Sequence, residues 1–252
     1  ATVNNGGTAT TINLDVSQTI GRFSVGYVTD STSVTGNVIL DDSGSNTTLT
    51  IGDSTTGGLL HVGSSLGTSN TIGGPNGTLT LEAGTTVSLV GGGFYLGTRQ
   101  DFPNAGVKTD TTGVMSMRPG SVLNVGTVGS RSLWAIGLNL SSGGDGTSSP
   151  FSAGTFSATG GNLTAYLSNL TVGQNTRGSS ETTGQKGTGV LNLTNLTSAF
   201  IDTDRLAIGT SGPGPADGTV TLGDNHTVRV GTGTTAGTVL IGVSSSGSYQ
   251  FR

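Results

Sequence analysis

The chain of 252 residues contains no cysteine, few aromatic residues and few charges of either sign. Without cysteine it can form neither a disulfide framework nor a thiolate-based catalytic or metal centre. Only ten residues are Lys or Arg, they are scattered along the chain, and the formal net charge is −4. Because binding to a nucleic-acid backbone needs clustered cations, this composition argues against a nucleic-acid partner.

Long apolar and long helical segments are also missing. No run approaches the ~18 consecutive apolar residues of a membrane-spanning helix, so no membrane insertion is expected. Every stretch long enough for a helix is interrupted by glycine, and β-branched residues are frequent throughout. Both features disfavour helices and favour strands. The predicted class is therefore all-β.

What the sequence has in abundance is glycine, with 46 residues, and one short pattern that recurs seven times. The pattern is an apolar residue, any residue, a second apolar residue and a glycine, as in Phe23–Gly26 and Trp134–Gly137. The closing glycines, called here the signature glycines, are Gly26, Gly63, Gly97, Gly137, Gly173, Gly209 and Gly242. They are 33 to 40 residues apart. Such regular spacing of one short unit indicates a solenoid or an array.

Each repeat contains two further strand patterns. One begins with a glycine and continues with apolar residues two and four places later, at Gly36, Gly77, Gly113, Gly154, Gly189 and Gly218. Its first copy, Thr10–Leu14, lacks the glycine. A weaker strand lies between this one and the signature strand, with apolar pairs such as Leu49 and Ile51. Alternation at period two is typical of a strand with one buried face.

Three strands in each repeat predict a right-handed parallel β-helix with about seven coils of ~36 residues, forming one domain over residues 1–252. Seven coils at a spacing of ~4.8 Å give a rod about 34 Å long. We expect each signature glycine to form a corner at which a positive φ favours glycine. Trp134 is expected to point inward from the fourth coil.

The third repeat also carries a family resemblance. Gly77–Leu81 (G-T-L-T-L), Glu82–Gly84 and Val87–Leu89 (V-S-L), together with signature strands such as Leu206–Gly209, resemble the passenger regions of bacterial autotransporters and their autotransporter-associated β-strand repeats. The resemblance covers Thr10–Val243. It implies a secreted β-helical rod, extracellular or attached to the bacterial surface, of the kind found among adhesins, fibres and biofilm components. The sequence lacks the membrane barrel and linker helix of a complete autotransporter, and no catalytic residue or cofactor is implied.

Three long connections follow the signature strands of the middle repeats. In a solenoid, equivalent insertions stack along one edge, so these connections are expected to form one continuous surface. This predicted interaction edge contains Arg99, Asp101, Lys108, Asp110, Asp145, Arg177, Glu181 and Lys186. The simpler interpretation is that these loops are solvated and only shield the rod.

Two acidic groups are the candidates for an enzymatic or metal site. Asp202 and Asp204 are separated by one residue and followed by Arg205, and they could share a proton or chelate a metal. The favoured interpretation is a solvated corner with a local pair between Asp and Arg. Asp41-Asp42 together with Asp53 could hold calcium, but the glycine-rich calcium-binding nonapeptide is absent.

The two histidines are weak catalytic candidates. His61 lies between Leu60 and Val62, so alternation predicts that it faces outward. His226 lies two residues before Val228 and is expected to point inward near a corner. Neither has a second His or Cys at the spacing of a metal site.

The sequence therefore favours a non-enzymatic extracellular β-solenoid that acts as a structural or adhesive rod. No capping element is recognisable after the seventh strand, so we expect the chain to be a fragment of a longer rod or to meet other chains at its ends. The expected partners are further copies assembled end to end, other surface proteins or glycans. The alternative is a polysaccharide-binding or polysaccharide-cleaving β-helix that uses the loop edge.

Overall fold

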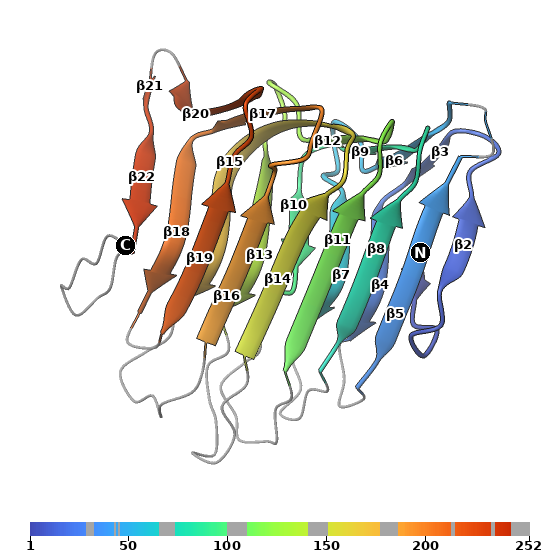
Figure 1. The fold of residues 1–252 in the computed structure, drawn as a ribbon, viewed down its shortest axis with the longest axis horizontal. Coiled ribbons are helices and arrows are strands. Elements are labelled where there is room, and N and C mark those ends of the chain that lie inside the picture. The colour runs from blue at the N-terminus through green and yellow to red at the C-terminus, as the bar shows by residue number, and fades with distance from the viewer. Residues whose placement is uncertain are drawn as a thin grey trace.

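The computed structural model describes residues 1–28, 33–42, 44, 46–65, 74–99, 110–140, 151–176, 186–212, 215–232 and 235–242. Every regular element within these residues is a β-strand, and nearly all strand pairs are parallel. Figure 1 shows the strands side by side along the long axis of the molecule. The predicted all-β class is confirmed.

One sheet, called here sheet I, consists of the glycine-led strands. It contains β2 (Thr10–Asn13), β5 (Thr35–Asp41), β8 (Asn76–Leu81), β11 (Thr111–Met117), β14 (Phe151–Ala158), β16 (Lys186–Asn192) and β19 (Ala216–Thr221). The strands pair in chain order, one repeat apart, and the leading glycines are register partners, as in Gly77 with Gly113 and Gly113 with Gly154. The sequence pattern therefore predicted these strands, and the six copies with a leading glycine pair in the register that it implies. The first copy, which lacks the glycine, is shifted by two residues, because Thr10 and not Ile12 pairs with Val38.

The second sheet has 15 strands and bends into two arms. The signature arm contains β1 (Thr2–Val3), β4 (Arg22–Val28), β7 (Leu59–Ser65), β10 (Gly93–Leu96), β13 (Ser132–Asn139), β18 (Arg205–Ser211) and β22 (Thr238–Ile241). The middle arm contains β3 (Gln18–Ile20), β6 (Thr48–Ile51), β9 (Thr86–Leu89), β12 (Val122–Val125), β17 (Ser198–Thr203) and β20 (His226–Thr232).

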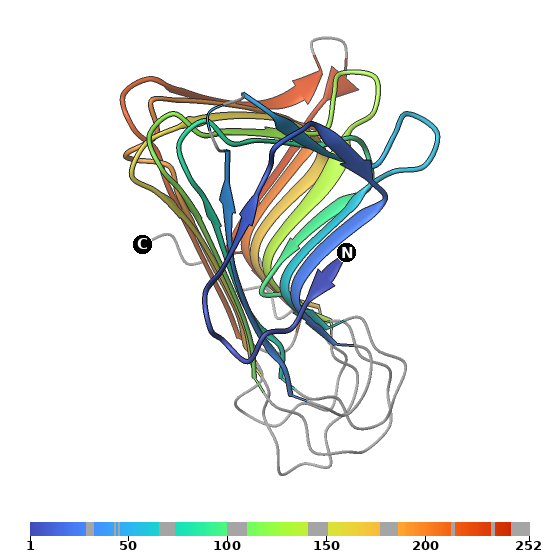
Figure 2. The same ribbon diagram turned by 90° about the vertical axis from the view of Figure 1, so that its right-hand side faces the viewer.

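The long strand β15 (Asn162–Asn175) joins the two arms. Its first half pairs with β12 and β17, and its second half pairs with β13 and β18. The short strand β21 (Thr235–Ala236) pairs antiparallel with β20. Viewed along the long axis in Figure 2, the sheets curl around a shared interior. Parallel pairing of equivalent strands one repeat apart is consistent with a β-solenoid.

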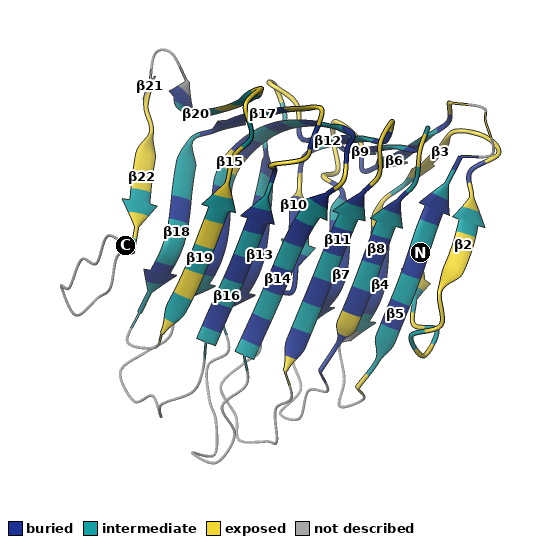
Figure 3. Cartoon of the chain, viewed as in Figure 1, coloured by how far each residue is buried: buried dark blue, intermediate teal, exposed yellow. Residues whose placement is uncertain are grey.

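The interior is filled by the apolar residues that alternate along each strand. Buried and half-exposed residues alternate strictly along β5, β11, β14 and β16, which Figure 3 shows as bands of two colours. Trp134 is fully buried, as predicted. Its ring stacks on Phe94 at 5.1 Å and meets the edge of Phe156 at 5.4 Å. The core is thus continuous between sheet I and the signature arm.

The signature glycines all have positive φ, between 56° and 66°. The predicted backbone conformation is confirmed, and five of the seven signature strands continue past the glycine and bend there. β13, for example, continues past Gly137 and pairs through Leu138 with Gln174. A Cβ on Gly137 would overlap the carbonyl oxygen of Thr188 and the backbone of Gly189. Glycine is needed both for its φ and because two backbones meet at this corner.

We predict that Gly137→Ala lowers the free energy of unfolding by more than about 2 kcal/mol, since it combines an unfavourable positive φ with a backbone overlap. Urea denaturation followed by the fluorescence of Trp134, which lies three residues away, measures the change. Gly21→Ala is the matched control, because a Cβ there has no neighbour within 4 Å. Equal stabilities of the two variants would contradict this account of the corner.

Candidate functional site

The loop edge predicted from the sequence is only partly within the described residues. Five of its eight members, Asp101, Lys108, Asp145, Arg177 and Glu181, lie outside them. Arg99 is fully buried, so its predicted place on an exposed edge is wrong. Its N–H donates to the carbonyl of Leu138 at 2.8 Å and its carbonyl accepts from Leu140 at 2.8 Å. The chain at Arg99 thus extends the ladder of the signature arm.

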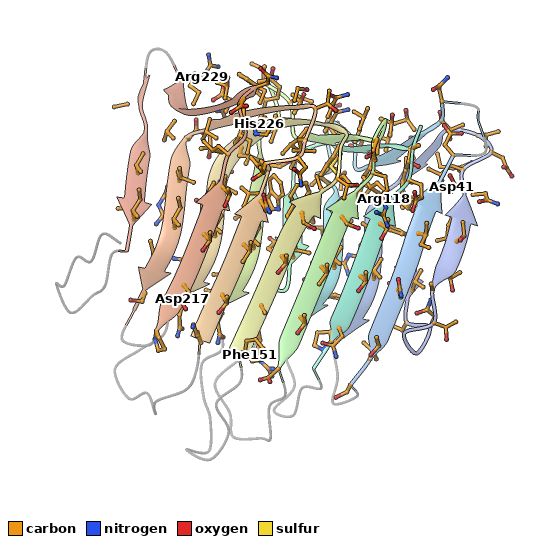
Figure 4. The ribbon with its side chains drawn as sticks, viewed as in Figure 1. Asp41, Arg118, Phe151, Asp217, His226 and Arg229 are labelled. Carbon is orange, nitrogen blue, oxygen red and sulfur yellow. The ribbon has the colours of Figure 1, made fainter. Side chains whose placement is uncertain are left out.

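Asp110 and Lys186, the other described members of that edge, lie at one end of sheet I. A carboxylate oxygen of Asp110 accepts a hydrogen bond of 3.1 Å from the backbone N–H of Phe151, and Lys186 forms an ion pair with Asp217. Figure 4 shows Phe151 and Asp217 at this same end of the sheet. Asp110 and Lys186 thus both have partners within the fold. The Lys186–Asp217 ion pair is weak because both side chains are exposed to solvent.

Asp202 is not a solvated corner residue, contrary to the prediction. Its side chain is only 2% exposed and pairs with two arginines. Arg131 approaches one carboxylate oxygen at 2.6 Å, and Arg229, its register partner on β20, pairs with the other oxygen. Arg131 comes from the connection between β12 and β13, 71 residues away in sequence. The predicted pairing with Arg205 is therefore wrong.

The residues beside Asp202 complete a charge network on the middle arm. Asp204 lies 3.2 Å from the same Arg131 guanidinium, so both aspartates do share one face, as expected. Arg205 instead donates to the side-chain oxygen of Asn169 at 3.2 Å. Asp202 raises the pKa of Arg229 through a hydrogen bond and its charge, and this guanidinium also lies over the ring of Phe200. Both carboxylate oxygens of Asp202 are thus engaged by arginines of the fold.

In the second acidic group, Asp42 and Asp53 form hydrogen bonds within local turns. Asp42 accepts hydrogen bonds from the backbone N–H groups of Gly44 and Thr47. Asp53 accepts from the hydroxyl of Thr55 and from backbone N–H groups of the same turn, and these bonds lower its pKa. Within the described residues no group of three or more His, Asp and Glu side chains is placed to hold a metal ion. These aspartates are turn-stabilising residues.

His61 is fully buried, although it was predicted to face outward into solvent. Its ring stacks on Tyr95 at 5.0 Å and contacts Tyr27 at 4.8 Å. Neither ring nitrogen has a hydrogen-bond partner. Burial, with a smaller contribution from the positive charge of Arg22, lowers its pKa to about 3. His61 is thus a neutral packing residue near pH 7.

His226 is half-buried and holds two corners together, near the position expected for it. Its Nδ1 accepts a hydrogen bond of 2.6 Å from the backbone N–H of Gly223. Its Nε2 therefore carries the proton and donates to the carbonyl of Leu196, 3.2 Å away. Figure 4 shows His226 near Arg229, far along the molecule from Asp41 and Arg118. Both ring nitrogens are used in the fold.

A groove of about 640 Å³ lies on the outer face of the middle arm, and the sequence analysis did not predict it. Its floor includes Thr50, Ser88, Asn124 and Thr164 from four neighbouring strands. One wall is the turn at residues 126–129, and Tyr166 also lines it. The volume is in the range of small-molecule and oligosaccharide sites. The row of polar residues can be recognised in the sequence. The sequence does not show that the turn at residues 126–129 forms a wall beside this row and makes the flat face a groove.

We predict that Asp202→Ala lowers the free energy of unfolding by about 1–3 kcal/mol, because Arg131 is largely buried and would lose its principal partner. Urea denaturation followed by circular dichroism measures the effect. Asp217→Ala removes an aspartate from an exposed pair and should cost less than about 1 kcal/mol. If Asp202→Ala lowers the free energy of unfolding no more than Asp217→Ala does, the structural role of the Asp202 network is contradicted.

The low pKa of His61 predicts a specific pH dependence. The unfolded chain takes up a proton near pH 6.5, whereas the folded chain does so only near pH 3. Stability from neutral His61 is therefore complete above about pH 6.5 and is lost as the pH falls towards 3. His61→Phe should reduce the loss of stability between about pH 7.5 and pH 4.5 by about 2–3 kcal/mol. The control variant Tyr95→Phe keeps both the stacked ring and His61, so it should leave the pH dependence of stability unchanged. If His61→Phe also leaves that pH dependence unchanged, the low pKa of His61 is contradicted.

The groove on the middle arm is thus a concave surface formed by described residues, and the ionisable groups considered above take part in turns, ion pairs and packing. Within the described residues there is no helix long and apolar enough to cross a membrane. Comparison of the chain with protein-family models, with curated proteins and with solved structures finds no match in any of the three.

Proposed function

We propose that the chain is a right-handed parallel β-helix, a single domain of seven coils with three strands in each. The support comes from the seven signature glycines with positive φ and from the pairing of each strand with its equivalent one repeat away. Right-handed coiling follows from the strong preference of parallel β crossovers for that hand. β15 represents the second and third strands of its coil fused into one.

We further propose that this solenoid is a non-enzymatic rod with a structural or adhesive role, outside the cell or on a bacterial surface. The observation that carries this proposal is the in-register stacking of equivalent residues along the whole described length, which makes a stiff, extended body. The aspartates and histidines that could have served catalysis are engaged in turns, ion pairs and packing. The alternative, polysaccharide binding or cleavage at the loop edge, has less support because the described members of that edge are buried or paired.

The last described strand favours self-association of the rod. Val239 and Ile241 of β22 occupy apolar column positions and are 52% and 43% exposed. Their register partners on β18 are Leu206 and Ile208. Another coil of the same kind would cover them and pair with the edge of β22 that no other described strand occupies. We therefore propose that copies of the rod stack end to end.

Electron microscopy of the purified chain at increasing concentration tests this proposal. We expect filaments with an axial repeat of about 34 Å, the length of seven stacked coils. Val239→Asp should abolish the filaments, because it places a charge in the stacking surface. Val128→Asp, on the side of the rod, should leave them intact. Short single rods at every concentration would refute end-to-end assembly while leaving the solenoid itself in place.

A further inference from the structure

The floor of the groove on the middle arm is a row of neutral polar side chains. Thr50, Ser88, Asn124 and Thr164 are direct register partners on β6, β9, β12 and β15. All four are half-exposed, and the amide of Asn124 donates to the hydroxyl of Ser88 at 3.1 Å. Neighbouring strands are ~4.8 Å apart. The groove therefore presents hydroxyl and amide groups at a regular interval along the axis of the solenoid.

The wall of the groove is a preformed apolar turn. It is closed by hydrogen bonds between Thr127 and Ser130, at 2.9 and 3.2 Å between backbone atoms. Val128, at its tip, is 72% exposed. Figure 2 shows such turns projecting from the corner between the middle arm and the signature arm. Since the turn is fixed by its own hydrogen bonds, a ligand would not have to order it on binding.

An aromatic ring lies beside the last member of the row of polar side chains, two residues after Thr164 on β15. Tyr166 is half-exposed, lines the groove and packs against Phe200 with ring centroids 5.8 Å apart. Asp202 on β17 is the register partner of Tyr166, and Arg229 on β20 is the register partner of Asp202. The ring thus offers an apolar surface of fixed orientation beside the hydroxyl and amide row.

Among the described residues that line the groove, none is charged. The nearest charges, Arg131, Arg229 and Asp202, are paired with one another. A strongly charged ligand would find no counter-charge in this groove, and a nucleic acid would need a basic one. A peptide could not add as a strand either, because β9 and β12 are hydrogen-bonded on both sides. The lining therefore suits a neutral ligand rich in hydroxyl groups with apolar faces.

We propose that this groove binds an extended, neutral, β-1,4-linked polysaccharide chain that lies along the solenoid axis. Its hydroxyl groups would exchange hydrogen bonds with Ser88, Asn124 and Thr164, whose spacing is close to the length of one sugar unit. An apolar face of a sugar ring would pack on Tyr166 and Val128. This binding site is separate from the loop edge and does not depend on end-to-end assembly of the rod.

Isothermal titration with four hexasaccharides tests the proposal: cellohexaose, xylohexaose, hexa-N-acetylchitohexaose and, as the acidic comparison, hexagalacturonate. At least one of the three neutral chains should bind the full chain at about 1 mM or below. Tyr166→Ala should weaken binding about threefold to tenfold through loss of the ring, whereas Tyr166→Phe should retain it. Val128→Asp should weaken binding at least about threefold, because it replaces apolar contact with a charge.

Val16→Asp is the matched control, since Val16 is an exposed valine that does not line the groove. Its affinity should equal that of the unaltered chain, and thermal unfolding should show that Val128→Asp remains folded. The proposal fails if no neutral hexasaccharide binds, if hexagalacturonate binds in preference, or if Val128→Asp binds as tightly as Val16→Asp. These outcomes are independent of whether filaments form.

Discussion

The stacking of each residue on its equivalent one repeat away is the constraint on which the rest of the structure depends. Parallel backbone pairing in register places identical positions of successive repeats in columns about 4.8 Å apart. The side chains that follow one another along a column must therefore pack well against each other. Inside, this condition favours apolar columns such as Phe94 on Trp134; at the bend it favours glycine on glycine. The Gly-rich and repetitive composition follows from this requirement.

The same constraint explains why charged residues are scarce. Like charges on neighbouring strands of a column would repel one another at close range. The buried carboxylate of Asp202 faces an opposite charge in its own column, because Arg229 is its register partner. Arg131 reaches the same carboxylate from a turn outside the column. Charge at this buried position is thus balanced within the fold, whereas the outward row Thr50, Ser88, Asn124 and Thr164 is neutral.

The parts of the fold set by local repetition could be predicted from the sequence, and the parts set by contacts between columns could not. The glycine-led strands, the positive φ of Gly137 and the burial of Trp134 follow from patterns within one repeat. The burial of His61 does not, because alternation alone assigns it to the outside. The burial of His61 depends on Tyr27 and Tyr95, which belong to other repeats and whose rings cover the imidazole ring from two sides. Arg131 was missed as a partner of Asp202 for the same reason, whereas the second partner, Arg229, lies in the same column as Asp202.

The groove shows how such a regular fold can acquire a distinct surface. The connection between β9 and β10 has three residues, 90–92, whereas that between β12 and β13 has six, 126–131. The longer connection stands above the face that the shorter one leaves open, so a difference in length between two corners creates a concavity without altering the core. Because the polar row beneath it faces away from the apolar columns, its side chains can vary at little cost in stability. In a fold whose interior must repeat, the outward rows and the corner lengths are where a binding specificity can arise.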